Sequence, residues 1–175
     1  MAGRYPVPRR QNRLGSKDSF DADRQKRQTV VMAEETIVVG VDTSDSSKEA
    51  LRWAARQAEL TGARLRVVIA WEIPTMAFWA PLPEGLDLAK DAREALDKTL
   101  EEVLGPEPKV SVSTVVVEGH PAPVLLEQSG DADLLVVGSR GHGEFTGMLL
   151  GSVSEHCVAH ASCPVVVIRQ QPTGH

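Results

Sequence analysis

The stretch "ADLLVVGSRGHG" (residues 132–143) leads from an apolar run directly into a loop that is rich in glycine. The run has aliphatic residues at consecutive positions, which is typical of a parallel strand that is buried on both faces. Glycine is costly in ordered structure unless the backbone needs a positive φ or another group has to approach it closely. The loop is therefore either a plain turn or a cradle for the phosphate of a ligand.

Strand-like and helix-like segments alternate along the chain. Apolar runs typical of strands occupy residues 36–41, 63–71, 109–117, 132–138 and 164–169, and helical spacing of apolar residues occupies 46–62, 85–104, 122–130 and 148–161. This alternation predicts βαβ units, and hence an α/β fold with one open parallel sheet and helices on both of its faces.

The pattern within each segment predicts its place in that sheet. The first and fourth runs are apolar throughout, so we expect them at the centre, whereas the third alternates more and is expected near an edge. Ser46 and Glu49 have the spacing of a capping box at the start of the first helix. Gly62 has the position of a C-cap at its end.

Length and composition suit a single domain. The chain has 175 residues, of which 42% are hydrophobic and 25% charged, and its formal net charge is -5. An acidic body does not favour nucleic acid as a partner, and no apolar run is long enough to span a bilayer. The chain has two cysteines, Cys157 and Cys163, which do not resemble a disulfide framework and favour a cytoplasmic location.

The N-terminal segment differs from the rest in its charge. Residues 1–31 contain eight Lys or Arg against three Asp, whereas the remainder contains 11 basic and 21 acidic residues. Because this segment has few aliphatic side chains, we expect residues 1–33 to be a disordered basic extension. A nucleic-acid-binding arm is the alternative, on charge alone. We expect the folded domain at 34–170 and a short tail at 171–175.

A ligand site is expected where the strand order reverses, beyond the carboxyl ends of the strands. Asp42 follows the first strand, and the glycine loop follows the fourth. If these strands are neighbours, Asp42 faces the loop across a crevice. A helix N-terminus suits a phosphate, and a carboxylate can accept from ribose hydroxyls or from the adenine amine. The simpler alternative is that the glycines only turn the chain and Ser152 only caps a helix.

Two common nucleotide fingerprints are absent from the sequence. No G-x-x-x-x-G-K-[ST] occurs, so the chain is not a P-loop hydrolase, and no G-x-G-x-x-G follows the first strand, which disfavours a dinucleotide site.

The spacing Gly138-x2-Gly141-x9-Gly151-Ser152 resembles the ATP-binding signature of the universal stress protein family. The stretches "IVVGVDTSDSSKEALRWA" (37–54), "GHPAPVLLE" (119–127) and "HASCPVVVIR" (160–169) resemble that family as well. The resemblance extends over residues 36–170 and implies an adenine nucleotide alpha hydrolase-like fold with a five-stranded parallel sheet of order 3-2-1-4-5.

The resemblance also implies a function: an ATP-binding regulatory module of the stress response, with or without Mg²⁺, that forms a homodimer through its last strand. Together with the other residues of the loop, it gives an expected nucleotide site of Gly40, Asp42, Ala70, Gly119, Val137, Gly138, Ser139, Arg140, Gly141, His142, Gly151, Ser152, Val153 and Ser154. A slow ATPase and a cyclic-nucleotide-binding protein are the alternatives for the same site.

Three further features of the sequence bear on its chemistry. His142 could act as a general base, but the loop lacks a phosphate-binding lysine, so we expect at most slow hydrolysis. His156, His160, Cys157 and Cys163 invite a metal hypothesis, but Cys157 falls on another side of the helix and Cys163 lies past its end, so we expect no metal site. Residues 71–85 concentrate Trp71, Phe78 and Trp79, and we expect this loop to cover the core rather than to form a lid or an interface.

Overall fold

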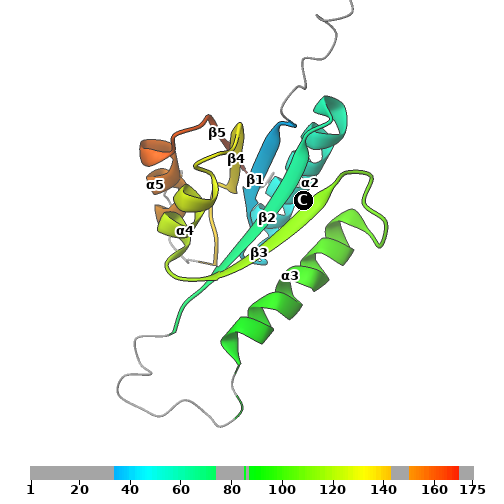
Figure 1. The fold of residues 1–175 in the computed structure, drawn as a ribbon. Coiled ribbons are helices and arrows are strands. Elements are labelled where there is room, and N and C mark those ends of the chain that lie inside the picture. Colours follow the sequence, from blue (N-terminus) through cyan, green and yellow to red (C-terminus); the bar gives the residue numbers. More distant parts are fainter. Residues whose placement is uncertain (1–33, 74–84, 86, 143–149, 170–175) are drawn as a thin grey trace, which may run out of the picture. The chain divides into compact units, whose positions relative to one another are not determined.

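The computed structural model describes residues 34–73, 85, 87–142 and 150–169, all within the unit Glu34–His175. Strands and helices alternate through these ranges (Figure 1). The elements are β1 (Thr36–Gly40), α2 (Asp45–Thr61), β2 (Arg64–Trp71), α3 (Leu88–Leu104), β3 (Val112–Glu118), α4 (Pro121–Gln128), β4 (Leu134–Gly138), α5 (Ser152–His160) and β5 (Val165–Ile168). The predictions for residues 1–33, for Phe78 and Trp79, and for the tail at 171–175 lie outside the described residues.

The strands form one parallel sheet of order β3-β2-β1-β4-β5. Val39 of β1 is opposite Val67 of β2 on one side and opposite Val136 of β4 on the other. From β1 the chain winds outward to β3, and from β4 it winds outward to the opposite edge. The strand order therefore reverses between β1 and β4. The predicted fold class, the strand order, the adjacency of β1 and β4, and the edge position of β3 are confirmed.

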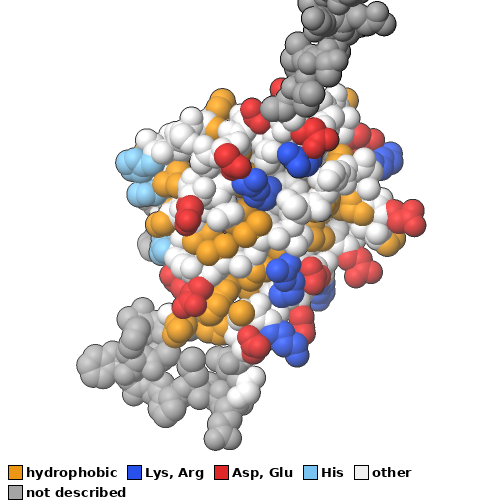
Figure 2. Space-filling view, viewed as in Figure 1, with side chains coloured by type: hydrophobic (Ala, Val, Ile, Leu, Met, Phe, Trp, Pro, Cys, Tyr) orange, Lys and Arg blue, Asp and Glu red, His pale blue; other side chains and the backbone are white. Residues whose placement is uncertain are grey.

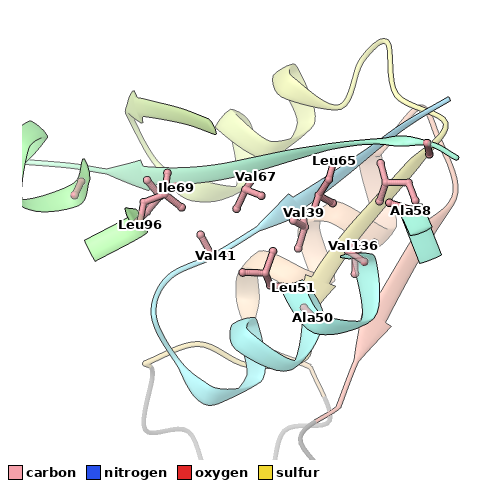
Figure 3. Close-up of a cluster of buried hydrophobic side chains, with 14 residues drawn as sticks. Val39, Val41, Ala50, Leu51, Ala58, Leu65, Val67, Ile69, Leu96 and Val136 are labelled. Carbon is pink, nitrogen blue, oxygen red and sulfur yellow. The ribbon is translucent and has the colours of Figure 1, made fainter. Parts of the chain in front are cut away.

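Helices α2 and α3 cover one face of the sheet (Figure 1). Ala50, Ala54 and Ala58 recur every fourth residue of α2 and are buried, so their small side chains let the helix lie close to the strands. Leu51 and Leu96 are completely buried in the same layer, and burying a side chain of this size stabilises the fold by about 1.5–3 kcal/mol. The labelled members of this cluster in Figure 3 are Val39, Val41, Ala50, Leu51, Ala58, Leu65, Val67, Ile69, Leu96 and Val136.

Helices α4 and α5 lie together on the other face (Figure 1). Their buried residues Val124, Leu125 and Cys157 pack in one cluster with Val38 and Val68 of the sheet. The side chains of β3 on this face are only half-buried. The cluster therefore covers this outer strand less completely than the central strands. Figure 2 shows hydrophobic side chains gathered over the region of β2 and β3, with acidic and basic side chains interspersed around them.

The N-terminal cap of α2 differs from the prediction. Ser44 is the N-cap, and its Oγ accepts a hydrogen bond from the backbone N–H of Ser47 at 3.3 Å. The predicted capping box of Ser46 and Glu49 was therefore wrong, because Ser46 already lies inside the helix and is buried. The predicted C-cap is confirmed: Gly62 has φ 76° and its N–H donates to the carbonyl of Ala58 at 2.9 Å.

Several other elements begin later than their sequence patterns indicate. α5 begins at Ser152 rather than at residue 148, because Gly151 is its N-cap. β3 begins at Val112 rather than at residue 109, because Val112 pairs with Leu65 and β2 itself begins only at Arg64. α3 begins at Leu88 rather than at residue 85, because the carboxylate of Asp87 accepts from the N–H of Lys90 at 3.0 Å and caps the helix there.

Candidate functional site

A cavity of about 500 Å³ lies at the carboxyl ends of β1 and β4, where the strand order reverses. Helix α4 and the start of α5 complete its wall. Its volume is typical of a site for a small molecule or cofactor. The residues that line it are Gly40, Val41, Asp42, Ser47, Val68, Ala70, Pro121, Leu125, Val137, Gly138, Arg140, Gly141, His142, Leu150, Gly151, Ser152, Val153, Ser154 and Glu155.

The side of the cavity toward β2 and α4 is apolar. Val68 and Ala70 of β2 line it together with Pro121 and Leu125 of α4. Gly40 lies directly beneath Leu125, since a Cβ atom at position 40 would come within 2.8 Å of the Leu125 Cδ1 atom. The glycine therefore lets α4 pack down onto the end of β1. A wall of this composition suits a flat, largely apolar ring.

The opposite side of the cavity consists of the glycine loop and the N-terminus of α5. Within the described residues, no side chain caps this helix, whose N-cap is Gly151. The first N–H groups of a helix have no acceptor within it, and here they belong to residues that line the cavity, Ser152 and Val153. The positive end of the helix dipole and free N–H groups suit an anion.

Two of the expected site residues, Ser139 and Ser154, hold this loop in place through hydrogen bonds. The buried hydroxyl of Ser154 is within hydrogen-bonding distance of the carbonyls of Ser139, at 3.1 Å, and Gly151, at 2.9 Å. The N–H of Ser139 donates to the carbonyl of Ile168 at 2.7 Å, and its carbonyl accepts from the N–H of Gly151 at 2.7 Å. These bonds fix the loop to β5 and to the start of α5.

The three glycines of the signature differ in what surrounds them. A Cβ atom at Gly138 would come within 2.6 Å of the Ser46 Oγ, and one at Gly141 would overlap the Asp42 carboxylate. Close approach within the protein therefore accounts for both. A Cβ atom at Gly151 would have only ordinary contacts, the nearest at 3.5 Å, and φ there is -79°. Nothing among the described residues requires glycine at this position, which lines the cavity.

Asp42 is fixed at the end of β1 by its neighbours. Its Oδ1 accepts from the N–H of Ser44 at 3.0 Å and from the Ser44 hydroxyl, and its own N–H donates to the Ser47 Oγ at 3.3 Å. Across the crevice, the Nε2 atom of His142 lies 2.6 Å from the main-chain oxygen of Asp42. The predicted juxtaposition of Asp42 with the glycine loop is therefore present.

Twelve of the fourteen expected site residues line the cavity; within the part of the chain that the structure describes, Gly119 and Ser139 do not. Gly119 has φ 144°, its N–H donates to the carbonyl of Trp71 at 2.8 Å, and a Cβ atom there would lie 3.1 Å from Val124. Its role is to turn the chain from β3 into α4.

Sequence reasoning missed seven lining residues, Val41, Ser47, Val68, Pro121, Leu125, Leu150 and Glu155. The sequence could have indicated two of them by their spacing from expected site residues. Val68 lies two residues before Ala70 on the same strand face, and Glu155 lies about one turn after Ser152 on α5. No sequence pattern indicates Pro121 and Leu125, because the packing of α4 over β1 and β2 brings them to the cavity.

The histidines and cysteines of α5 and β5 do not converge. His156 and His160 have ring centroids 4.4 Å apart on the exposed side of α5. Cys157 is completely buried under the helix, and burial raises the pKa of its thiol to about 11. Burial also raises the pKa of Cys163, and both cysteines are free. Among the described residues, no three His, Cys, Asp or Glu side chains group as metal ligands would.

None of the helices in the described part of the chain has the length and apolar character needed to cross a bilayer.

Comparison with known proteins relates this chain to one family. Residues 34–169 match the family model described as the universal stress protein family. Universal stress protein Rv2623 of Mycobacterium tuberculosis is 42% identical over 142 residues, which cover 77% of this chain and 48% of that protein. The chain thus spans about half the length of this curated relative.

Solved structures give the same result. UspA from Lactobacillus plantarum superposes with a TM-score of 0.64 at 26% identity, covering 77% of this chain and 97% of that one. A universal stress protein solved in complex with cAMP superposes with a TM-score of 0.51 at 27% identity, covering 78% and 97%. The fold is the adenine nucleotide alpha hydrolase-like fold of those proteins. This chain belongs to the universal stress protein family.

Proposed function

We propose that the chain binds ATP in the cavity between β1 and β4 and acts as a nucleotide-dependent regulatory module in the stress response. One observation carries the proposal: a single cavity joins an apolar wall on β2 and α4 to a glycine loop and to the N-terminus of α5, which no side chain of the described residues caps. The apolar wall suits the adenine ring, the α5 N-terminus suits the phosphates, and Asp42 offers an acceptor to the ribose hydroxyls.

The free space at Gly151 supports the phosphate assignment. Close approach within the protein accounts for glycine at positions 138 and 141, but not at 151. A ligand oxygen that approaches the N–H groups of Ser152 and Val153 would pass this position, so a side chain there would obstruct it. We propose that ligand approach is the reason for glycine at 151.

Mg²⁺ belongs to the proposal because of the charge of the lining. Among the described residues that line the cavity, Arg140 has a cationic side chain, whereas Asp42 and Glu155 carry carboxylates. A triphosphate would therefore meet little net positive charge from side chains, and a divalent cation would supply the missing neutralisation. Glu155, at the start of α5, is the residue that would hold it, since Asp42 is assigned to the ribose. Carboxylate oxygens are ligands that Mg²⁺ accepts.

A cyclic nucleotide is the second candidate, because a universal stress protein of similar fold was solved in complex with cAMP. The two candidates differ in the phosphate chain. ATP would use the N-terminus of α5 fully, whereas a cyclic monophosphate offers a single phosphate group. We propose binding rather than turnover as the main activity, with slow hydrolysis of ATP as a side reaction.

The proposal also includes an assembly and a location. β5 is an edge strand that pairs with β4 on one side, and all four of its valine and isoleucine residues are only half-buried. An apolar edge of this kind favours pairing with another strand, so we propose that two copies of the chain associate through β5. The free thiols of Cys157 and Cys163 support a reducing, cytoplasmic location.

The decisive experiment is mass spectrometry of the small molecules released from freshly purified protein, followed by calorimetric titration with ATP and with cAMP. ATP in the released fraction and tighter binding of ATP support the proposal. Tighter binding of cAMP would favour the second candidate. Binding of neither nucleotide would overturn both candidate functions. Multiple rapid turnovers of ATP would show that the protein is an ATPase rather than a binding module.

A further inference from the structure

His142 joins the two loops that border the cavity. Its Nε2 atom lies 2.6 Å from the main-chain oxygen of Asp42 and 3.1 Å from the Thr43 Oγ1. A carbonyl oxygen can only accept, so a hydrogen bond to Asp42 requires Nε2 to carry the hydrogen. We call this contact of His142 with Asp42 and Thr43 the clasp.

The backbone on the other side of the clasp is strained. Thr43 has φ 71°, and among the described residues it is the one non-glycine residue with a positive φ. A β-branched residue rarely adopts this conformation, which persists only where surrounding contacts enforce it. The clasp holds the turn from the side of the glycine loop, and the hydrogen bonds between Ser44 and the Asp42 carboxylate hold it from the side of α2.

Asp42 is thereby fixed through both its main chain and its side chain. The clasp holds its carbonyl, Ser44 holds Oδ1, and Gly141, next to His142 in the chain, leaves just enough room for Oδ2. The carboxylate and the glycine loop therefore keep one relative position. A preorganised acceptor binds its ligand more tightly, because no ordering cost remains to be met on binding.

We propose that His142 is a positioning residue for the nucleoside half of the ligand, acting through Asp42 rather than by contact with the phosphates. This inference rests on the proposed function, because it assigns a role to His142 in that same site. It differs from a phosphate contact through Nε2, because the Nε2–H that would donate to a phosphate is directed at a backbone carbonyl. It differs from a general-base role of Nε2 as well, because a nitrogen that carries the hydrogen has no free lone pair to accept a proton.

Two substitutions test the clasp. His142→Ala removes the donor, and we expect it to weaken adenosine and ATP binding about three- to tenfold, the effect of losing one hydrogen bond. Binding of inorganic triphosphate should change by less than about twofold. His142→Gln places an amide N–H₂ donor near the position of Nε2 and should restore most of the affinity. The matched control is His156→Ala, which removes an exposed histidine that does not line the cavity and should leave all three affinities unchanged.

A second pair of measurements separates positioning from direct contact. If His142 acts through Asp42, His142→Ala should cost nothing further in an Asp42→Ala background. In ligand-free protein, nitrogen NMR should show the His142 ring as the Nε2–H tautomer. This measurement needs no variant, so it tests the clasp even where the alanine variant does not fold.

The possible failures are distinct. Equal weakening of triphosphate and ATP by His142→Ala, additive losses in the double variant, or an Nδ1–H tautomer would overturn the positioning role while leaving nucleotide binding in place. No rescue by glutamine would overturn it as well. A wild-type protein that binds neither adenosine nor ATP would overturn the proposed function, and the inference with it.

Discussion

Gly141 lies so close to Asp42 that a Cβ atom at position 141 would overlap the carboxylate oxygen Oδ2. The carboxylate has little freedom to move aside, because its other oxygen accepts from the N–H and the hydroxyl of Ser44. The glycine thus sets the distance between the loops that follow β1 and β4. Gly141, which the family resemblance assigns to ligand contact, thus also has a structural role that needs no ligand.

Gly141→Ala should therefore displace the Asp42 carboxylate. We expect ATP affinity to fall about tenfold, because an acceptor that has moved can no longer bond well with the ribose. Calorimetry would measure the change. In an Asp42→Ala background the same substitution should cost almost nothing, since its overlapping partner is gone. An equal loss in both backgrounds would show that Gly141 acts on the ligand directly.

Gly151 should behave in the opposite way. Its Cβ position meets the Arg140 Cα atom at 3.5 Å, an ordinary contact, so Gly151→Ala and Gly151→Val should both fold. We expect Gly151→Val to abolish ATP binding, because its branched side chain obstructs the approach of phosphate to the N-terminus of α5. Thermal unfolding would check that both variants fold, and calorimetry would check that the valine variant no longer binds ATP.

The Gly151 variants also distinguish the binding of the phosphates from the binding of the adenosine. Inorganic triphosphate should lose affinity together with ATP, whereas adenosine should bind almost as before. Gly151→Ala serves as a graded control and should lie between the wild type and the valine variant. Unchanged ATP affinity in Gly151→Val would remove this glycine from the phosphate site.

Much of the fold was predictable because it depends on local patterns. The burial of β1 and β4 on both faces shows as uninterrupted aliphatic runs, and the alternation in β3 shows its place at an edge. The cap of α2 was not predictable in this way. Ser44, Ser46 and Ser47 are all suitable caps by residue type, and the turn at Thr43 decides which of them lies just outside the helix.

The candidate site was predictable for residues that stand at or just after the end of a strand. Asp42 and Gly138 lie close together because β1 and β4, the strands at whose ends they stand, are neighbours in the sheet. The apolar wall depends on how α4 crosses the sheet, and nothing local to Pro121 or Leu125 indicates that crossing. The environment of Ser139 is equally non-local, because its N–H is taken by Ile168 of β5.

Burial of the Cys157 thiol should make stability depend on alkaline pH. Burial raises its pKa from the ordinary value of 9.0 to about 11, because the thiolate is poorly solvated in the core. Above pH 9 the unfolded chain releases this proton while the folded protein retains it, so unfolding becomes easier as pH rises toward about 11. Between about pH 8 and about pH 10.5 the contribution to the free energy of unfolding should fall by about 2 kcal/mol.

Urea unfolding of wild type and Cys157→Ala at the two pH values would isolate this contribution, since all other titrating groups are shared. The wild type should lose more stability than the variant over the interval. Cys163→Ala is the matched control: its thiol is only partly buried, so this variant should keep most of the pH dependence. Equal pH dependence in wild type and Cys157→Ala would show that the thiol reaches water in the folded protein.

Asp42→Ala tests the strand arrangement and the proposed site together. The carboxylate lies across the crevice from the glycine loop, and its Oδ2 is the oxygen that Ser44 leaves free. If it accepts from the ribose, the substitution should weaken ATP binding by about 1.5–3 kcal/mol, the range for hydrogen bonds to a charged group. Inorganic triphosphate should bind almost as before, because it offers no donor to a carboxylate.

The same substitution also removes two hydrogen bonds to Ser44 at the start of α2, so the free energy of unfolding should fall by about 1 kcal/mol. Ser44→Ala is the matched control, because it removes the cap of α2 and the hydroxyl bond while keeping the carboxylate. It should lose comparable stability but much less ATP affinity. If Ser44→Ala weakened ATP binding as strongly as Asp42→Ala does, the carboxylate would act on the turn alone. If Asp42→Ala weakened the binding of triphosphate and of ATP equally, Asp42 would act on the phosphate end of the cavity. The orientation proposed for the nucleotide would then have to be reversed.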